Sequence, residues 1–264
     1  MSPAVAEILV GVERELSANG CGLLYGVATS DHALAIDRIL RQGARAIISL
    51  DAPEALSGAG AANLLVVGIT SGWSDSCADI SSVSPQDVAG LALAYLRSLG
   101  HERLAMIISA GFADAASIHG GFAVASDVRL VPVAPGEDGA GARAMESLLE
   151  RQPRPTAVFC SDDALAVGAL SACYRCGLRV PDDMGLLGCG DSPLARATLP
   201  ALSSIRFPWS FVGKMAARRV LAALNDGQDA TNAKQPVGLK IVVRASTQRL
   251  VPRETNVPRG TAGD

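Results

Sequence analysis

The chain has 264 residues, of which 49% are hydrophobic and 19% are charged. That length fits one large α/β unit or two lobes of ordinary size, and the hydrophobic content excludes a wholly disordered chain. The net charge of −3 argues against direct nucleic-acid binding by this segment, because such binders usually carry a basic face.

Short apolar runs alternate with longer amphipathic runs along the chain. The short runs are rich in Val, Ile and Leu, as strands buried on both faces are. They predict strands at Leu23–Thr29, Ala46–Leu50, Leu64–Ile69, Arg103–Ser109, Leu130–Ala134, Thr156–Cys160, Met184–Cys189 and Leu239–Arg244. Apolar residues at helical spacing predict helices at Ala4–Asn19, His32–Arg41, Pro85–Leu99, Asp163–Cys176 and Trp209–Asn225. This alternation indicates parallel sheets with right-handed crossovers.

The two ends of the chain bear on its location. No stretch approaches the roughly 18 apolar residues of a membrane span. Glu7, Glu13, Arg14 and Glu15 interrupt any signal-peptide core, so we expect a cytoplasmic protein with reduced cysteines. The tail 252–264 is rich in Pro, Gly, Thr and charge, and we expect it to be disordered.

The sequence predicts no metal site and no cofactor. The three histidines lie in three different segments. Cys173 and Cys176 form a C-x-x-C pattern, which can signal redox or zinc chemistry. However, the pair falls in the last turn of a predicted helix, whereas redox pairs use a helix N-terminus to lower a thiol pKa. We therefore interpret both as structural thiols.

We also predict no catalytic residues, and so no enzyme. The chain has no G-x-S-x-G nucleophile elbow. Asp162 and Asp163 are a possible carboxylate pair for acid–base work. The favoured alternative is that these acids cap the helix after a strand and contact a ligand.

Small polar residues follow several predicted strands. In open α/β sheets, ligands lie beyond the carboxyl ends of the strands. The residues at those ends are Thr29–Asp31, Thr70–Trp73, Ser161–Asp163 and Gly190–Ser192. Together they form a plausible floor for a small polar ligand. Trp73 is either a ligand contact or a loop residue packed on the surface.

Six ordered motifs resemble those of the LacI/GalR family of bacterial transcription regulators. Leu96–Ala105 resembles L-x-x-x-G-H-x-x-I-A, and Pro155–Gly168 resembles P-T-A-V-F-x-x-N-D-x-x-A-x-G. The remaining four are Gly177–Asp183 for G-L-R-V-P-x-D, Leu187–Asp191 for V-G-F-D-D, Pro200–Ile205 for P-x-L-T-T-I, and Val243–Thr247 for V-x-R-x-S-T. Each motif alone is weak, but six in order are a specific signal.

The resemblance implies a periplasmic-binding-protein-like type I fold, an α/β architecture of two Rossmann-like lobes with parallel sheets. It places residues 1–105 and 208–236 in the N-terminal lobe, and 106–207 and 237–251 in the C-terminal lobe. The first strand of the N-terminal lobe is missing, because Ser2–Val5 already matches the start of the family's first helix. A helix-turn-helix headpiece is likewise absent, so we expect a fragment of a longer regulator.

The resemblance also implies a binding site between the lobes. Its predicted effector contacts are Val5, Ser30, Trp73, Phe112, Ile118, Asp162, Asp163, Gly190 and Asp191. Ile118 stands where the family often has an arginine, and Gly190 where it has an acid. Loss of the arginine removes the usual anchor for carboxylates or sugar hydroxyls. We expect a sugar, nucleoside or amine-like effector, the amine being suggested by Asp162 and Asp191.

The implied partners are a second copy of the chain and a small-molecule effector. Operator DNA is contacted only through a headpiece that this chain lacks, and no membrane is involved. The alternatives are a transporter's solute-binding protein, a degenerate dimerisation module that binds nothing, and an enzyme on a Rossmann-like sheet. The last lacks a G-x-G-x-x-G after its first strand.

Overall fold

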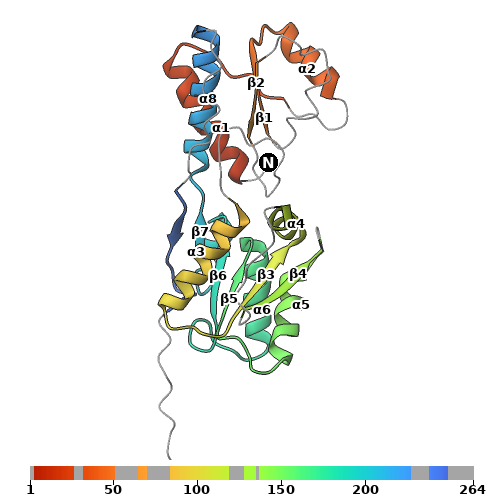
Figure 1. Cartoon of the computed structure of the whole chain (residues 1–264), viewed down its shortest axis with the longest axis vertical. Helices are drawn as coiled ribbons and strands as arrows, with labels where there is room; N and C mark the ends of the chain where they lie inside the picture. The colour runs from red at the N-terminus through yellow and green to blue at the C-terminus, as the bar shows by residue number, and fades with distance from the viewer. Residues whose placement is uncertain are drawn as a thin grey trace, which may run out of the picture.

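Two sheets, each built mainly from parallel strands, organise the computed structural model of the chain (Figure 1). The structure describes residues 3–26, 32–50, 65–69, 84–118, 128–134, 137–226 and 238–248. The strands are β1 (Ala46–Leu50), β2 (Leu65–Ile69), β3 (Leu104–Ser109), β4 (Val128–Val133), β5 (Ala157–Cys160), β6 (Gly185–Cys189), β7 (Ser203–Arg206) and β8 (Lys240–Val242). The helices are α1 (Pro3–Ala18), α2 (His32–Arg41), α3 (Pro85–Ser98), α4 (Ala110–Ile118), α5 (Ala140–Glu150), α6 (Asp163–Arg175), α7 (Pro193–Ala197) and α8 (Trp209–Asp226).

The larger sheet has six strands in the order β4-β3-β5-β6-β7-β8. Its first five strands are parallel, and β8 joins antiparallel to β7. Central strands β3, β5 and β6 are apolar and almost wholly buried, because helices cover both faces. The predicted α/β class with mostly parallel strands is confirmed.

One face of the large sheet packs on α5 and α6, and the other on α3 and α4. Helix α3 begins where the sequence predicted. Ser84 and Asp87 form a reciprocal capping box, and Pro85 occupies the first turn, where its missing N–H costs nothing.

The smaller sheet pairs β1 with β2 in parallel. Its core is shared with α1 and α8, whose apolar rows meet β2 at Val67 and Ile69. Residues 21–26 form no strand, so the predicted strand at Leu23–Thr29 is wrong over that part. The rest of that prediction lies outside the described residues. We attribute the difference to a missing neighbour, because a strand needs a pairing partner and β1 pairs only with β2 in the described chain.

The packing of α3 bears on the predicted lobe boundary near residue 105. Its buried side chains, including Val88, Leu93 and Leu96, lie against β3, β5 and β6 of the large sheet. Helix α8, by contrast, packs on α1 (Figure 1). Helix α3 therefore packs with the large sheet, although the prediction assigned its residues to the N-terminal lobe. The lobe boundaries stay predictions.

Candidate functional site

The carboxyl end of the large sheet collects the polar residues that follow its strands. Strands β3, β5, β6 and β7 are parallel, so their carboxyl ends meet at one edge of the sheet. Strand β7 leads through Phe207 and Pro208 into α8, so this edge faces the part that contains α1 and α8 (Figure 1). Topology therefore places the predicted ligand floor between the two parts of the chain.

Asp162 caps the helix that follows β5. Its Oδ1 accepts the backbone N–H of Leu165 at 2.8 Å, which satisfies one of the orphan donors at the start of α6. Burial raises the pKa of this carboxyl, and hydrogen bonds from backbone N–H groups oppose that shift. The predicted capping role is confirmed, and the half-buried side chain stays a candidate ligand contact.

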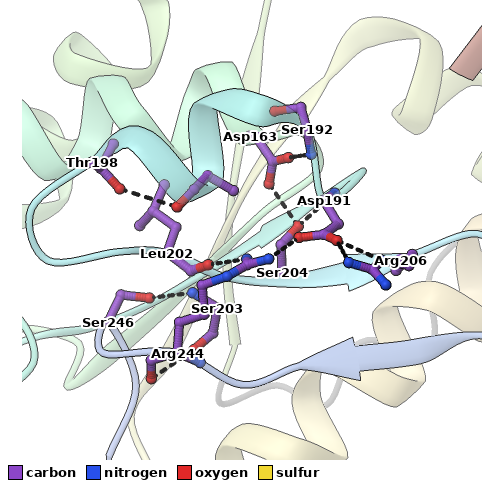
Figure 2. A network of polar contacts seen from close by, with 11 residues as sticks. Asp163, Asp191, Ser192, Thr198, Leu202, Ser203, Ser204, Arg206, Arg244 and Ser246 are labelled. Carbon is purple, nitrogen blue, oxygen red and sulfur yellow. Dashed lines mark hydrogen bonds and ion pairs between the residues drawn. The ribbon is translucent and has the colours of Figure 1, made fainter. Parts of the chain in front are cut away.

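Asp163 is buried and its carboxylate is held by the protein itself. Oδ1 accepts the Ser204 hydroxyl at 2.6 Å, and Oδ2 accepts the Ser192 backbone N–H at 2.6 Å (Figure 2). Burial raises the pKa of Asp163, and these donors pull it back toward the charged form. The carboxylate therefore joins β7 and the start of α7 to α6, a structural role that leaves little capacity for acid–base chemistry.

The turn after β6 needs an unusual backbone. Gly190 has φ of 115° and Asp191 has φ of 48°, both in the left-handed half of conformational space. Glycine reaches such values freely, and aspartate is among the few other residues that tolerate them. Two bonds hold the turn: the Gly190 N–H donates to the Ile205 carbonyl at 2.7 Å, and the Asp191 N–H donates to Ser204 Oγ at 2.9 Å.

Two arginines form ion pairs with the Asp191 carboxylate. Arg206 at the end of β7 pairs with Oδ2, and Arg244 just beyond β8 pairs with Oδ1 (Figure 2). The Asp191 side chain is only 1% exposed, so its charge is compensated within the protein. A cationic ligand would have to displace a guanidinium group here, which removes much of the reason to expect an amine.

A chain of hydroxyl groups extends this network to α3. Ser203 Oγ accepts the backbone N–H of Arg244 at 2.8 Å and lies 2.7 Å from Thr247 Oγ1. Thr247 Oγ1 in turn lies 2.8 Å from Tyr95 Oη on α3. Ser246 Oγ donates to the Leu186 carbonyl at 2.6 Å and accepts the Ser203 N–H at 2.8 Å. Sequence reasoning missed these roles, although the motifs at Pro200–Ile205 and Val243–Thr247 marked the residues.

The other predicted contacts are scattered. Val5 is half-buried on α1, whereas Phe112 is fully buried and packs on Phe159 with ring centroids 6.2 Å apart. Phe112 is therefore a core side chain in this structure. Ile118 is the last residue of α4, with its side chain outside the described part. Ser30 and Trp73 lie outside the described residues, so their predicted contacts stay predictions.

The C-x-x-C pair separates into one buried and one exposed thiol. Cys173 packs in the core between α5 and α6, and Cys176 caps the C-terminus of α6. Burial raises the pKa of the Cys173 thiol to about 12. Within the described residues, no cluster of His, Cys, Asp and Glu is suited to hold a metal ion, and no helix is long and apolar enough to cross a bilayer.

We predict that iodoacetamide modifies Cys176 and leaves Cys173 intact in the folded protein, because only the thiolate reacts and the Cys173 thiol stays protonated and buried. Peptide mapping by mass spectrometry at neutral pH checks this. Cys21, which is exposed, serves as a positive control, and labelling in urea should reach every cysteine. Equal labelling of Cys173 and Cys176 in the native protein would refute the prediction.

His101, from the first motif, is a buried residue at the opposite end of the large sheet. The residue is 2% exposed, and Nε2 lies 3.3 Å from the Gln248 carbonyl oxygen, to which it can donate. Nδ1 has no hydrogen-bond partner among the described residues. Burial lowers the pKa of His101, and the Gln248 carbonyl opposes that shift. The fold therefore favours the neutral imidazole.

This preference predicts a pH-dependent contribution to stability. Below the ordinary histidine pKa of about 6.5 the unfolded chain takes up a proton that the folded His101 resists, so stability falls as pH decreases. The parent should lose stability more steeply than His101→Gln between neutral and mildly acidic pH, by at most about 1.4 kcal/mol per pH unit. Urea unfolding of both proteins across that range tests this, and parallel pH profiles would contradict it.

Comparison with known proteins gives the family. A model of the periplasmic binding protein-like domain family matches residues 93–247. A probable HTH-type transcriptional repressor ExuR of Bacillus subtilis is 36% identical over 111 residues, which are 42% of this chain and 33% of that protein. The ribose operon repressor of Haemophilus influenzae is 42% identical over 86 residues, 33% of this chain and 26% of that protein. The matched segments thus span a third or less of these relatives.

Solved structures show the same fold across nearly the whole chain. A LacI transcriptional regulator from a Rhodococcus species is 27% identical, with a TM-score of 0.71, covering 95% of this chain and 96% of that one. A LacI family regulator from Bifidobacterium animalis subsp. lactis has a TM-score of 0.72 at 21% identity, covering 94% and 96%. The chain therefore belongs to the periplasmic binding protein-like domain family, and its fold is that of LacI family regulators.

Proposed function

We propose that this chain is the small-molecule-sensing part of a transcriptional repressor and that it is not an enzyme. The observation that carries the proposal is the family match over residues 93–247, with repressors among the relatives. The site supports it: Asp163, one member of the possible carboxylate pair with Asp162, is held by Ser192 and Ser204, and Asp191 is held by two arginines. The whole regulator would bind operator DNA through a separate domain.

The effector we propose is a neutral polyhydroxylated molecule, such as a sugar or nucleoside, held at the carboxyl edge of the large sheet. Compensation of Asp191 by two arginines disfavours a cation there. Asp162 offers a half-buried acceptor suited to a hydroxyl group. A regulator of this fold from Enterococcus faecium was solved with ribose, and the CelR regulator with cellobiose.

A thermal-shift screen tests the proposal directly. Sugars, nucleosides and amines are compared, with nucleotides included as probes of an enzyme site. A true effector should raise the melting temperature in a saturable way, since a ligand at 100 times its Kd adds about 2.7 kcal/mol. Asp162→Ala should abolish the shift of any hit, whereas Asp182→Ala, at a remote exposed acid, should retain it. A hit among nucleotides alone, or none, would count against the sensor.

The proposed mechanism is a population shift between arrangements of the two parts. An effector that contacts both parts favours one arrangement, and a homodimer would transmit the change to DNA-binding domains. One structural neighbour is a dimeric Lac repressor. Sedimentation of this chain at micromolar concentration tests the dimer. A gel-shift assay at low salt should show no sequence-specific DNA binding by these 264 residues, given the net charge of −3.

A further inference from the structure

Helix α8 lies between two strands of the large sheet in chain order. The outgoing segment leaves β7 through Phe207 and Pro208 and enters α8. The returning segment is described from residue 238 and forms β8 (Figure 1). Strands β7 and β8 are antiparallel neighbours, with Arg206 opposite Lys240 at the end of their pairing. The two segments therefore leave the sheet side by side.

Asp191 fastens both segments to the turn after β6. Its carboxylate accepts Arg206 from the outgoing segment on one oxygen and Arg244 from the returning segment on the other (Figure 2). The anchor is itself rigid, because the Asp191 N–H donates to Ser204 Oγ of β7. One buried carboxylate thus pairs with Arg206, at the end of β7 where the outgoing segment leaves the sheet, and with Arg244, which lies beyond the other end of β8.

The two ion pairs differ in their surroundings. Arg244 is 14% exposed and also donates to the Leu202 carbonyl at 2.6 Å, so it is fixed within the sheet. Arg206 is 46% exposed and is the last residue of β7 before the connection to α8. The Arg206 pair is the more accessible of the two to solvent, because water already reaches its guanidinium group.

Trp209 lies on the far side of this connection. It stacks on Phe207, with ring centroids 5.0 Å apart and planes 17° from parallel. It also packs against the hydrophobic clusters of both parts of the chain. A change in the direction of the chain at Arg206 must therefore move Trp209 against both cores.

We propose that the Asp191–Arg206 ion pair is a latch that restricts the angle between the large sheet and the part that contains α1 and α8. With the latch closed, the outgoing segment is fixed along the edge of β7 and Trp209 keeps its place between the cores. With the latch open, the connection pivots about Phe207 and Pro208. The latch acts in the unliganded chain, so the proposal stands apart from any effector.

Pulsed electron paramagnetic resonance between two native cysteines measures this angle. Cys21 follows α1 and Cys176 ends α6; both are exposed, whereas Cys160, Cys173 and Cys189 are buried. In a Cys77→Ser background, spin labels on Cys21 and Cys176 report the separation of the two parts. We expect Arg206→Gln to broaden the distance distribution and to shift its mean by several ångström, while Arg206→Lys, which keeps the charge, stays near the parent.

Two controls keep the experiment decisive. Arg143→Gln removes an exposed arginine that pairs with Glu137 on the surface, and it should leave the distribution unchanged. High salt on the parent should change the distribution in the same direction as Arg206→Gln but by less, because Arg206 is 46% exposed whereas Asp191 is only 1% exposed. This arm also serves if the variant folds poorly. A distribution unchanged both in salt and in a folded Arg206→Gln would overturn the proposal.

Discussion

Replacement of Asp191 by alanine is expected to lower the free energy of unfolding by about 3–5 kcal/mol, because it leaves two arginines without their counter-charge. The unpaired charge costs most at Arg244, because its guanidinium group is largely buried and keeps only the Leu202 carbonyl as acceptor. The turn also loses a residue suited to a φ of 48°. Urea unfolding followed by circular dichroism measures the loss.

Asp37→Ala is the matched control. Asp37 pairs with Arg41 one helical turn away on α2, and both side chains are more than half exposed. Such surface pairs contribute at most about 1 kcal/mol. If the two alanine variants proved equally stable, the Asp191 network would be a surface feature, and its interpretation as a junction between strands would fail.

The large sheet could be predicted strand by strand where its strands are apolar. Strands β3, β5 and β6 lie within one or two residues of their predicted bounds, because helices on both faces demand continuous hydrophobic runs. Strand β7 was missed, since it begins with Ser203 and Ser204 and looks polar. Both serines are nevertheless fully buried, and their hydroxyl groups are satisfied by Arg244, Thr247 and Asp163. A hydrophobic pattern does not predict that a polar residue is buried when its hydrogen-bond partners lie about forty positions away in the sequence.

Three helices were also absent from the prediction, for local reasons. Helix α5 starts at Ala140 after a glycine and has no side-chain cap, so it lacks the usual start signal. Helix α4 is built largely from small residues, and α7 has only five residues. In each case packing on the sheet, rather than intrinsic preference, decides the conformation.

The position of the candidate site was easier to predict than its contacts. Asp162, Asp163, Gly190 and Asp191 were placed together by one rule, that the carboxyl ends of parallel strands meet at one edge, and they do meet there. The rule says nothing about which polar groups face a ligand. Asp191 faces Arg206 and Arg244, and the latter comes from a segment 53 residues further along. Only the folded structure shows that the Asp191 carboxylate is already paired with two arginines.

The contact between α1 and α8 depends on glycine at two positions where the helix backbones nearly touch. A Cβ atom on Gly213 would lie 2.1 Å from the Ile8 carbonyl oxygen, and one on Gly11 would lie 1.9 Å from the Ser210 carbonyl oxygen. Neither backbone can give way without separating the helices. We expect Gly213→Ala to destabilise the protein by roughly 1–3 kcal/mol, the usual cost of overpacking a core.

Gly90→Ala is the control that separates this close approach from the general effect of glycine in helices. Gly90 lies on the exposed face of α3, and a Cβ atom there would meet nothing within 4 Å. Its replacement should stabilise the protein by about 0.5–1 kcal/mol, because alanine loses less backbone entropy on folding. Gly213→Ala gains the same helix propensity as Gly90→Ala. Any net loss in its free energy of unfolding therefore measures the steric conflict between α1 and α8. If both variants were stabilised in urea unfolding, α1 and α8 would not pack this closely, and the layer that Trp209 contacts would differ from the one described.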